Sequence, residues 1–150
     1  MSSTYKYLAA YFAMNETSYP YKAYRQTCAY QSTKGFMKVL GYKTVPANNP
    51  TALLNAVAQQ PVAIALNAAS SVFQYYRSGI LSSTTCGTTL NHAVILIGYG
   101  TSNGVDFWLV KNSWGTGWGE SGYVRILRNM TALNSGICGL QNSLNVYPYY

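Results

Sequence analysis

Residues 90–100 read LNHAVILIGYG, in which an almost unbroken apolar run follows the single histidine of the chain, His92. It opens a series of short apolar segments with glycines between them, at 92–99, 105–112, 122–128 and 143–147. Short strands that follow one another through short turns pair in antiparallel fashion. The pattern predicts a small, mostly antiparallel barrel or curled sheet.

The first half of the chain predicts helices and further extended segments. Apolar side chains recur at helical spacing over 4–13, so we expect a helix that begins with the chain. Asn49 followed by Pro50 is typical of a helix start, with Asn as the cap and Pro in the first turn. Residues 36–45 and 62–66 are expected to be extended. The expected fold class is α+β, with an N-terminal helix and one or two short helices.

Composition limits the class of protein. The chain has 150 residues, of which 49% are hydrophobic and 9% charged, whereas disordered chains are poor in apolar residues. The net charge of +7 comes from scattered Lys and Arg without an aromatic-basic motif, so nucleic-acid binding is not expected. An acidic partner segment would offset that charge. We also expect no membrane span and see no signal-peptide pattern at the N-terminus.

The three cysteines, Cys28, Cys86 and Cys138, form an odd number. They lack C-x-x-C spacing and are accompanied by one histidine, so neither a zinc site nor another cofactor is expected. In an oxidising compartment one pair could form a disulfide, and the remaining thiol would indicate a partner elsewhere.

Residues 108–120, WLVKNSWGTGWGE, are the second unusual stretch, in which an apolar strand ends at Asn112 and a tryptophan-containing loop follows. Neighbouring antiparallel strands can bring residues twenty apart side by side, so His92 is the natural partner of Asn112. A neutral amide can orient an imidazolium beside a thiolate without adding a second negative charge, and a tryptophan can exclude water from the pair. This pattern suits a cysteine nucleophile. The alternative interpretation is a glycine-rich hairpin whose tryptophans belong to the core.

Six segments carry a family resemblance. In order and spacing, TSYPYKA, QQPVAIALNA, FQYYRSGIL, LNHAVILIGYG, FWLVKNSWGTGWGESGYVRI and SGICGL resemble the C-terminal two-thirds of papain and cathepsin-type cysteine peptidases. The resemblance implies that His92 is the acid/base, Asn112 its orienting group and Trp114 the ring that shields both. Trp118 would pack near the primed side of the cleft.

The same resemblance implies a domain division and a disulfide. Residues 1–30 would be a remnant of the family's helical domain, and residues 31–150 mainly its β-barrel domain. Cys86 and Cys138 match a family disulfide, whereas Cys28 matches a cysteine whose partner lies upstream of residue 1. Cys28 would otherwise be an ordinary buried free thiol.

The nucleophile of the family lies in a C-G-S/A-C-W/Y motif, about 130 to 150 residues before the His and Asn. No such motif occurs in the chain. We therefore expect the chain to supply the His/Asn half of the site to an N-terminal peptidase segment or chain that carries the nucleophile, and to be inactive alone. One alternative is an inactive binding or structural module derived from such a peptidase. Another is an unusual site that uses Cys28 or Cys86.

The resemblance also implies a peptide-binding surface and a compartment. Ala65, Leu90, Ala93 and Ser143 would line the second subsite, and the backbone near Asn91 would offer hydrogen bonds to an extended peptide. Because these side chains are small or apolar, we expect a hydrophobic residue two positions before the cut. The alternative is that they are core residues of the barrel. Relatives of this kind imply a lysosomal, vacuolar or secreted protein.

Overall fold

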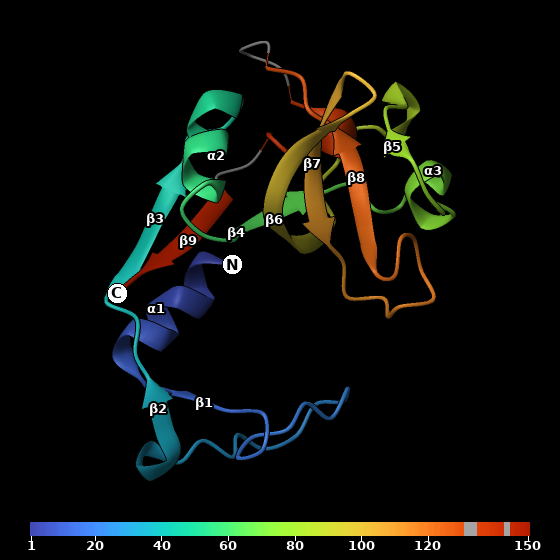
Figure 1. Ribbon diagram of the computed structural model, residues 1–150. Coiled ribbons are helices and arrows are strands. Elements are labelled where there is room, and N and C mark those ends of the chain that lie inside the picture. The colour runs from blue at the N-terminus through green and yellow to red at the C-terminus, as the bar shows by residue number, and fades with distance from the viewer. Residues whose placement is uncertain (131–134, 143–144) are drawn as a thin grey trace. The chain divides into compact units, whose positions relative to one another are not determined.

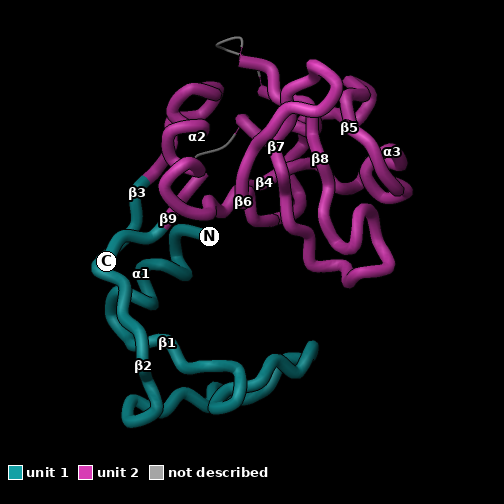
Figure 2. The backbone as a smooth tube through the Cα atoms, viewed as in Figure 1, with its two compact units in different colours: residues 1–43, 148–150 teal, residues 44–147 magenta. Residues whose placement is uncertain are grey.

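The computed structural model describes residues 1–130, 135–142 and 145–150 (Figure 1). The chain forms two compact units (Figure 2). Unit 1 consists of residues 1–43 and 148–150, and unit 2 of residues 44–147. The described hydrophobic core lies in unit 2, whereas Val39 is the single buried residue among those described in unit 1. The expected boundary at residue 30 stays a prediction about family domains.

Unit 1 contains the helix α1 (Ser2–Ala10) and the short antiparallel strands β1 (Ala13–Met14) and β2 (Gly35–Met37). A 3-10 turn, Ser32–Lys34, precedes β2. The expected N-terminal helix is confirmed, but it ends at Ala10 instead of residue 13, because Tyr11 is extended and Ala13 pairs with Met37.

Seven strands form the large sheet, in the order β3-β9-β4-β6-β7-β8-β5. Their bounds are β3 (Gly41–Val45), β4 (Val62–Leu66), β5 (Ile80–Leu81), β6 (His92–Ser102), β7 (Val105–Lys111), β8 (Tyr123–Leu127) and β9 (Asn145–Tyr149). β4 pairs antiparallel with β6 and β9, β7 pairs antiparallel with β6 and β8, and β5 is parallel to β8. The α+β class with a mostly antiparallel sheet is confirmed. The sheet stays open, with β3 and β5 at its edges, and does not close into a barrel.

The helix α2 (Pro50–Val57) starts as its sequence predicts. The Asn49 side chain accepts a hydrogen bond of 2.9 Å from the N–H of Ala52, which satisfies one of the free donors of the first turn. Pro50 lies in the first turn of the helix, where a backbone N–H has no acceptor within the helix. Leu53 is buried in the core of unit 2. The remaining helix, α3 (Ser71–Gln74), buries Phe73 in a segment whose sequence predicts turns.

The hairpin of β6 and β7 positions the residues of interest. Asn103 and Gly104 both have positive φ, the conformation that a tight two-residue hairpin turn requires. Alternation along β6 buries Val94 and Leu96, and alternation along β7 buries Trp108 and Val110. The same alternation assigns His92, two residues before Val94, and Asn112, two residues after Val110, to the core-facing side of the sheet.

In the described part of the chain, no helix has both the length and the apolar character that crossing a bilayer requires.

Candidate functional site

His92 and Asn112 form a hydrogen bond at the end of the β6–β7 pair. The distance between His92 Nε2 and Asn112 Oδ1 is 2.8 Å. The same Oδ1 accepts the N–H of Ser113 at 2.8 Å, and because a backbone N–H can only donate, this contact identifies the atom as the amide oxygen. Nε2 therefore carries the proton and donates it, so Nδ1 is the ring nitrogen that can face a reacting group.

The backbone and burial of Asn112 fix its side chain. Its N–H donates to the carbonyl of Gly122 at 2.9 Å, so the loop that leaves β7 returns to close over the strand end. Only 7% of Asn112 is exposed, and its Nδ2 has no hydrogen-bond partner among the described residues. The amide oxygen therefore makes two hydrogen bonds in a buried position, one to the imidazole and one to the backbone.

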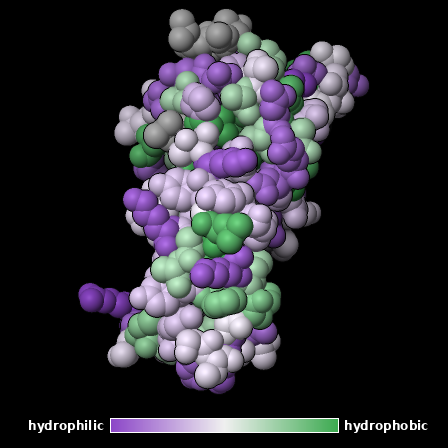
Figure 3. All heavy atoms as spheres, turned by 90° about the vertical axis from the view of Figure 1, so that its left-hand side faces the viewer, coloured by the Kyte–Doolittle hydropathy of each residue, from purple (hydrophilic) through white to green (hydrophobic). Residues whose placement is uncertain are grey.

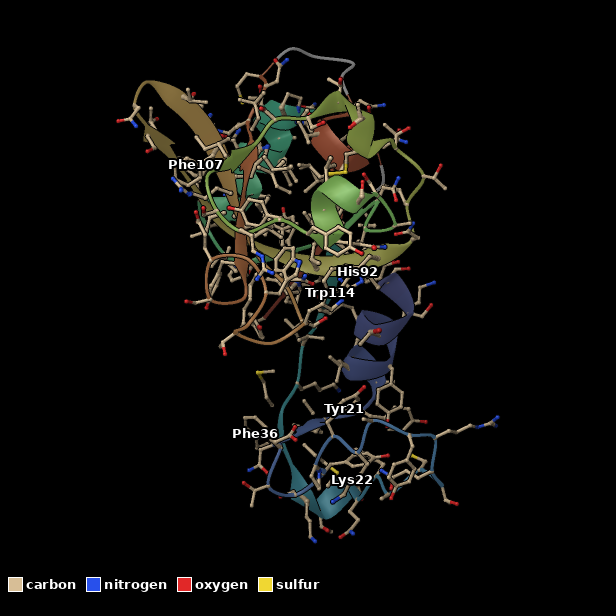
Figure 4. The ribbon with its side chains drawn as sticks, turned by 90° about the vertical axis from the view of Figure 1, so that its right-hand side faces the viewer. Tyr21, Lys22, Phe36, His92, Phe107 and Trp114 are labelled. Atoms are coloured by element: carbon tan, nitrogen blue, oxygen red, sulfur yellow. A yellow bond between two sulfur atoms is a disulfide. The ribbon has the colours of Figure 1, made fainter. Side chains whose placement is uncertain are left out.

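Trp114 covers the His92 ring, and Figure 4 shows the two side chains next to each other. Their ring centroids are 5.1 Å apart with an interplanar angle of 33°. Trp114 also meets the edge of Phe73 at 5.5 Å, yet 42% of the residue remains exposed. The ring thus packs against both His92 and Phe73, while part of the residue stays open to solvent.

Trp118 packs against Trp114. Its ring centroid lies 5.4 Å from that of Trp114, 5.0 Å from Phe73 and 5.6 Å from Tyr76. Its Nε1 donates to the carbonyl of Gln74 at 3.0 Å. Both tryptophans are therefore packed among aromatic rings, and Trp114 also lies beside His92.

Two of the residues expected to bind a peptide lie side by side. Ala65 and Ala93 are cross-strand partners in the β4–β6 pair, the first half-buried and the second exposed. Leu90 is half-buried next to Gly139, where an added Cβ would lie 3.2 Å from Leu90 Cδ2. Ser143 lies outside the described residues.

Asn91 makes hydrogen bonds within the protein that the sequence does not indicate. Its N–H donates to the carbonyl of Leu66 at 3.1 Å, and its Oδ1 accepts the N–H of Ala68 at 2.8 Å. Its Nδ2 donates to Asn67 Oδ1 at 2.9 Å. A peptide that binds at this point must use the Asn91 carbonyl, because the N–H is already engaged.

The disulfide between Cys86 and Cys138 is present, and it joins the 3-10 turns Thr84–Cys86 and Ile137–Gly139. Both residues are buried. Cys28 is a free thiol in unit 1, and it is exposed instead of buried.

Sequence reasoning missed an ion pair behind the tryptophans. Glu120 accepts bonds from Arg125 Nε at 2.9 Å and Nη2 at 2.7 Å, and from the N–H of Gly79 at 2.9 Å. The hydrogen bonds from Arg125 hold the pKa of Glu120 below its usual value, and the same pair raises the pKa of Arg125. Burial raises the pKa of Tyr76, whose hydroxyl bonds to the same segment. The available signal was that Glu120 is one of three acidic residues in the chain.

A profile of one protein family, described as papain family cysteine protease, matches residues 1–148. The chain is 45% identical over 126 residues to germination-specific cysteine protease 1 of Arabidopsis thaliana, a match that covers 83% of this chain and 33% of that protein. It is also 45% identical over 142 residues to the cathepsin L-like proteinase of Fasciola hepatica, covering 93% and 42% of the two chains. The chain thus spans between a third and about two-fifths of these relatives.

Solved structures of cysteine proteases share the fold. Bromelain protease from Ananas comosus, in complex with the E64 inhibitor, superposes with a TM-score of 0.88 at 40% identity, over 99% of this chain and 68% of that chain. Digestive procathepsin L 3 of Tenebrio molitor larval midgut gives a TM-score of 0.90 at 39% identity, over 100% and 48% of the two chains.

Proposed function

Because the chain belongs to the papain family of cysteine proteases, we propose that it supplies the acid/base half of a cysteine endopeptidase site. The observation that carries the proposal is the bond of 2.8 Å between His92 Nε2 and Asn112 Oδ1, under the ring of Trp114. This geometry gives the imidazole a fixed tautomer and leaves Nδ1 for a thiol.

In the proposed reaction, His92 Nδ1 takes the proton of a cysteine thiol, which yields an imidazolium and a thiolate. The thiolate attacks the carbonyl carbon of the scissile peptide bond. The imidazolium then gives its proton to the departing amine, and a thioester remains. His92 next removes a proton from water, which attacks the thioester and releases the carboxylic acid and the thiol. Asn112 accepts from Nε2–H throughout and keeps the ring in place.

The nucleophile of this reaction comes from another segment or chain. Cys86 and Cys138 share a disulfide, so neither offers a thiol. Cys28 is free but follows Gln26 and Thr27, so it does not lie in the C-G-S/A-C-W/Y motif that carries the nucleophile of the family. We infer that this polypeptide does not cleave peptides alone.

The surface of unit 1 suits a polypeptide partner. It buries a single described residue, Val39, and exposes large apolar side chains that include Tyr21, Tyr24 and Phe36. On the face drawn in Figure 3, hydrophobic residues lie among hydrophilic ones. A unit that buries one described residue and exposes such side chains is expected to gain buried apolar surface by binding a partner. Unit 1 also carries six exposed Lys and Arg against one acidic residue, Glu16, so the partner is expected to be acidic.

The substrate is proposed to be an extended peptide with a hydrophobic residue two positions before the cut. The described residues that support this proposal are Ala65 and Ala93, which are apolar cross-strand partners, and Leu90, which is apolar and half-buried. In the assembled enzyme, a peptide library should be cleaved best at such sequences, and a preference for a basic residue at that position would contradict the proposal. The disulfide supports an oxidising compartment, such as the lysosome, the vacuole or the extracellular space.

The intact mass of native material, before and after reduction, tests the partnership. A larger species that releases a chain of 16.5 kDa on reduction would show Cys28 bridged to a partner, whose sequence should contain the nucleophile. A mass of 16.5 kDa in both states, together with a monomer under native conditions, would contradict the proposal and favour an inactive module. The tight packing of Phe73, Trp114 and Trp118 is the observation that supports that second candidate.

A further inference from the structure

A hydrogen-bond network lies behind the tryptophans and takes no part in the proposed chemistry. Its centre is Glu120, whose carboxylate accepts three N–H groups, two from Arg125 on β8 and one from Gly79 before β5. Both charged side chains are about three-quarters buried, with 26% of Arg125 and 27% of Glu120 exposed. A forked pair with a third donor is more rigid than an ordinary surface ion pair.

Tyr76 extends the network. Its hydroxyl donates to the carbonyl of Gly79 at 2.7 Å and accepts the N–H of Arg125 at 3.4 Å. Three parts of unit 2 therefore meet at one point: the tryptophan loop (residues 113–122), the segment between α3 and β5, and β8.

The backbone of the tryptophan loop is fitted closely to this point. At Gly119, where φ is +56°, an added Cβ would lie 2.6 Å from the Tyr123 carbonyl oxygen and 3.1 Å from the Tyr76 ring. Only glycine allows this approach. Beside it, Trp118 Nε1 donates to the Gln74 carbonyl at 3.0 Å.

A chain of ring contacts connects the network to the imidazole. The Tyr76 ring contacts Trp118 at a centroid distance of 5.6 Å, Trp118 contacts Trp114 at 5.4 Å, and Trp114 contacts His92 at 5.1 Å. Interiors of this kind transmit displacements because the rings are closely packed. A loop that lifts at Glu120 would therefore withdraw the Trp114 ring from His92.

We propose that Glu120 and Arg125 are positioning residues, which hold the tryptophan loop down so that Trp114 keeps water from the His92–Asn112 pair. The consequence of this shielding for catalysis rests on the proposed function of the His92–Asn112 pair. The shielding itself is a property of this chain and can be measured without a nucleophile.

The single histidine of the chain makes shielding measurable. In proton NMR spectra, the exchange of the Nε2–H of this histidine with water reports directly on the shielding of the bond to Asn112. In the full chain, Glu120→Gln should increase this exchange rate by about fivefold, because it weakens the bonds that close the loop.

Asp106→Asn is the matched control. Asp106 forms the other described ion pair, with Arg128 at 2.9 Å, and Arg128 lies over the rings of Tyr99 and Trp108. Like Glu120→Gln, Asp106→Asn removes one negative charge by replacing a carboxylate with an amide. It should leave the rate measured at His92 within about twofold of that in the unmodified chain. Equal rates for both variants would overturn the proposal.

Trp118→Phe is a second variant that decides the matter if Glu120→Gln does not fold. It keeps an aromatic ring but loses the N–H donated to Gln74, so a smaller rise in the His92 rate is expected. An unchanged rate in Trp118→Phe, with a far-ultraviolet spectrum like that of the unmodified chain, would overturn the proposal as well. Neither result depends on peptidase activity, so failure here is distinguishable from failure of the proposed function.

Discussion

His92 and Asn112 meet at a distance of 2.8 Å between Nε2 and Oδ1, although twenty residues separate them in the sequence. The antiparallel pairing of β6 with β7, in which Ile95 opposes Lys111, brings the start of one strand to the end of the other. The return of the loop from Asn112 to Gly122 then fixes the amide. The hairpin and the loop that follows it therefore bring the two side chains together.

Asn112→Ala should lower the kcat of the assembled enzyme by about 100-fold, because the imidazole loses the acceptor that fixes its tautomer and orientation. Steady-state kinetics of the assembled enzyme measure the effect. Ser113→Ala is a suitable control, because Ser113 is exposed and the bond to Asn112 uses its backbone N–H, which the substitution keeps. Equal kcat values for Asn112→Ala and the unmodified enzyme would show that Asn112 does not orient the ring.

Trp114→Ala should expose the His92 Nε2–H to solvent. In proton NMR spectra of the chain, the signal of this ring proton should broaden through exchange with water, whereas Tyr75→Ala should leave it sharp. Tyr75 is a suitable control because it is 75% exposed and lies at the C-terminal end of α3. A sharp signal in Trp114→Ala would contradict the shielding role of Trp114.

Removal of the disulfide with Cys86→Ala and Cys138→Ala should lower the free energy of unfolding by about 4 kcal/mol in the chain-entropy model, because the bond closes a long loop in the unfolded chain. The two cysteines are 52 residues apart. Urea denaturation followed by tryptophan fluorescence gives the value. Cys28→Ser should leave the transition unchanged, since this thiol is free and exposed. A similar loss for Cys28→Ser would indicate that the disulfide is not the cause.

Acid should loosen the tryptophan loop. The pKa of Glu120 is lowered from its usual 4.5 in the folded chain, chiefly by the hydrogen bonds from Arg125. The unfolded state therefore binds the proton more readily, so the stabilisation from Glu120 is present above pH 4.5 and is lost as the pH falls through the lowered folded pKa. Tryptophan fluorescence between neutral pH and acid should show a change that is absent in Glu120→Gln. Identical acid transitions in both chains would contradict this assignment.

Local signals in the sequence predict much of the fold. Asn49 and Pro50 predict the start of α2, and the apolar segments at 92–99 and 105–112 predict β6 and β7. The proximity of His92 and Asn112 follows from antiparallel pairing, which a short turn imposes. These features depend on neighbours in the sequence, so one chain is enough to predict them.

Features that depend on distant contacts were not predicted. The sequence does not show that Glu120 would meet Gly79, because forty-one residues separate the two. The open edges of the sheet, at β3 and β5, likewise depend on how far the sheet curls, which no local pattern determines. The hydrogen bonds that engage Asn91 arise from β4 and the residues after it, and they change which of its groups a peptide can reach.

Peptide hydrolysis shows whether His92 and Asn112 serve a thiolate that another segment supplies. The chain should be assayed alone and after refolding with the nucleophile-bearing segment of a relative, with His92→Ala refolded in the same way as the control. We predict no hydrolysis by the chain alone, hydrolysis by the assembled pair, and none by the pair that contains His92→Ala. Hydrolysis by the chain alone, or an inactive pair that is correctly assembled, would contradict the claim that His92 and Asn112 serve a thiolate from another polypeptide segment.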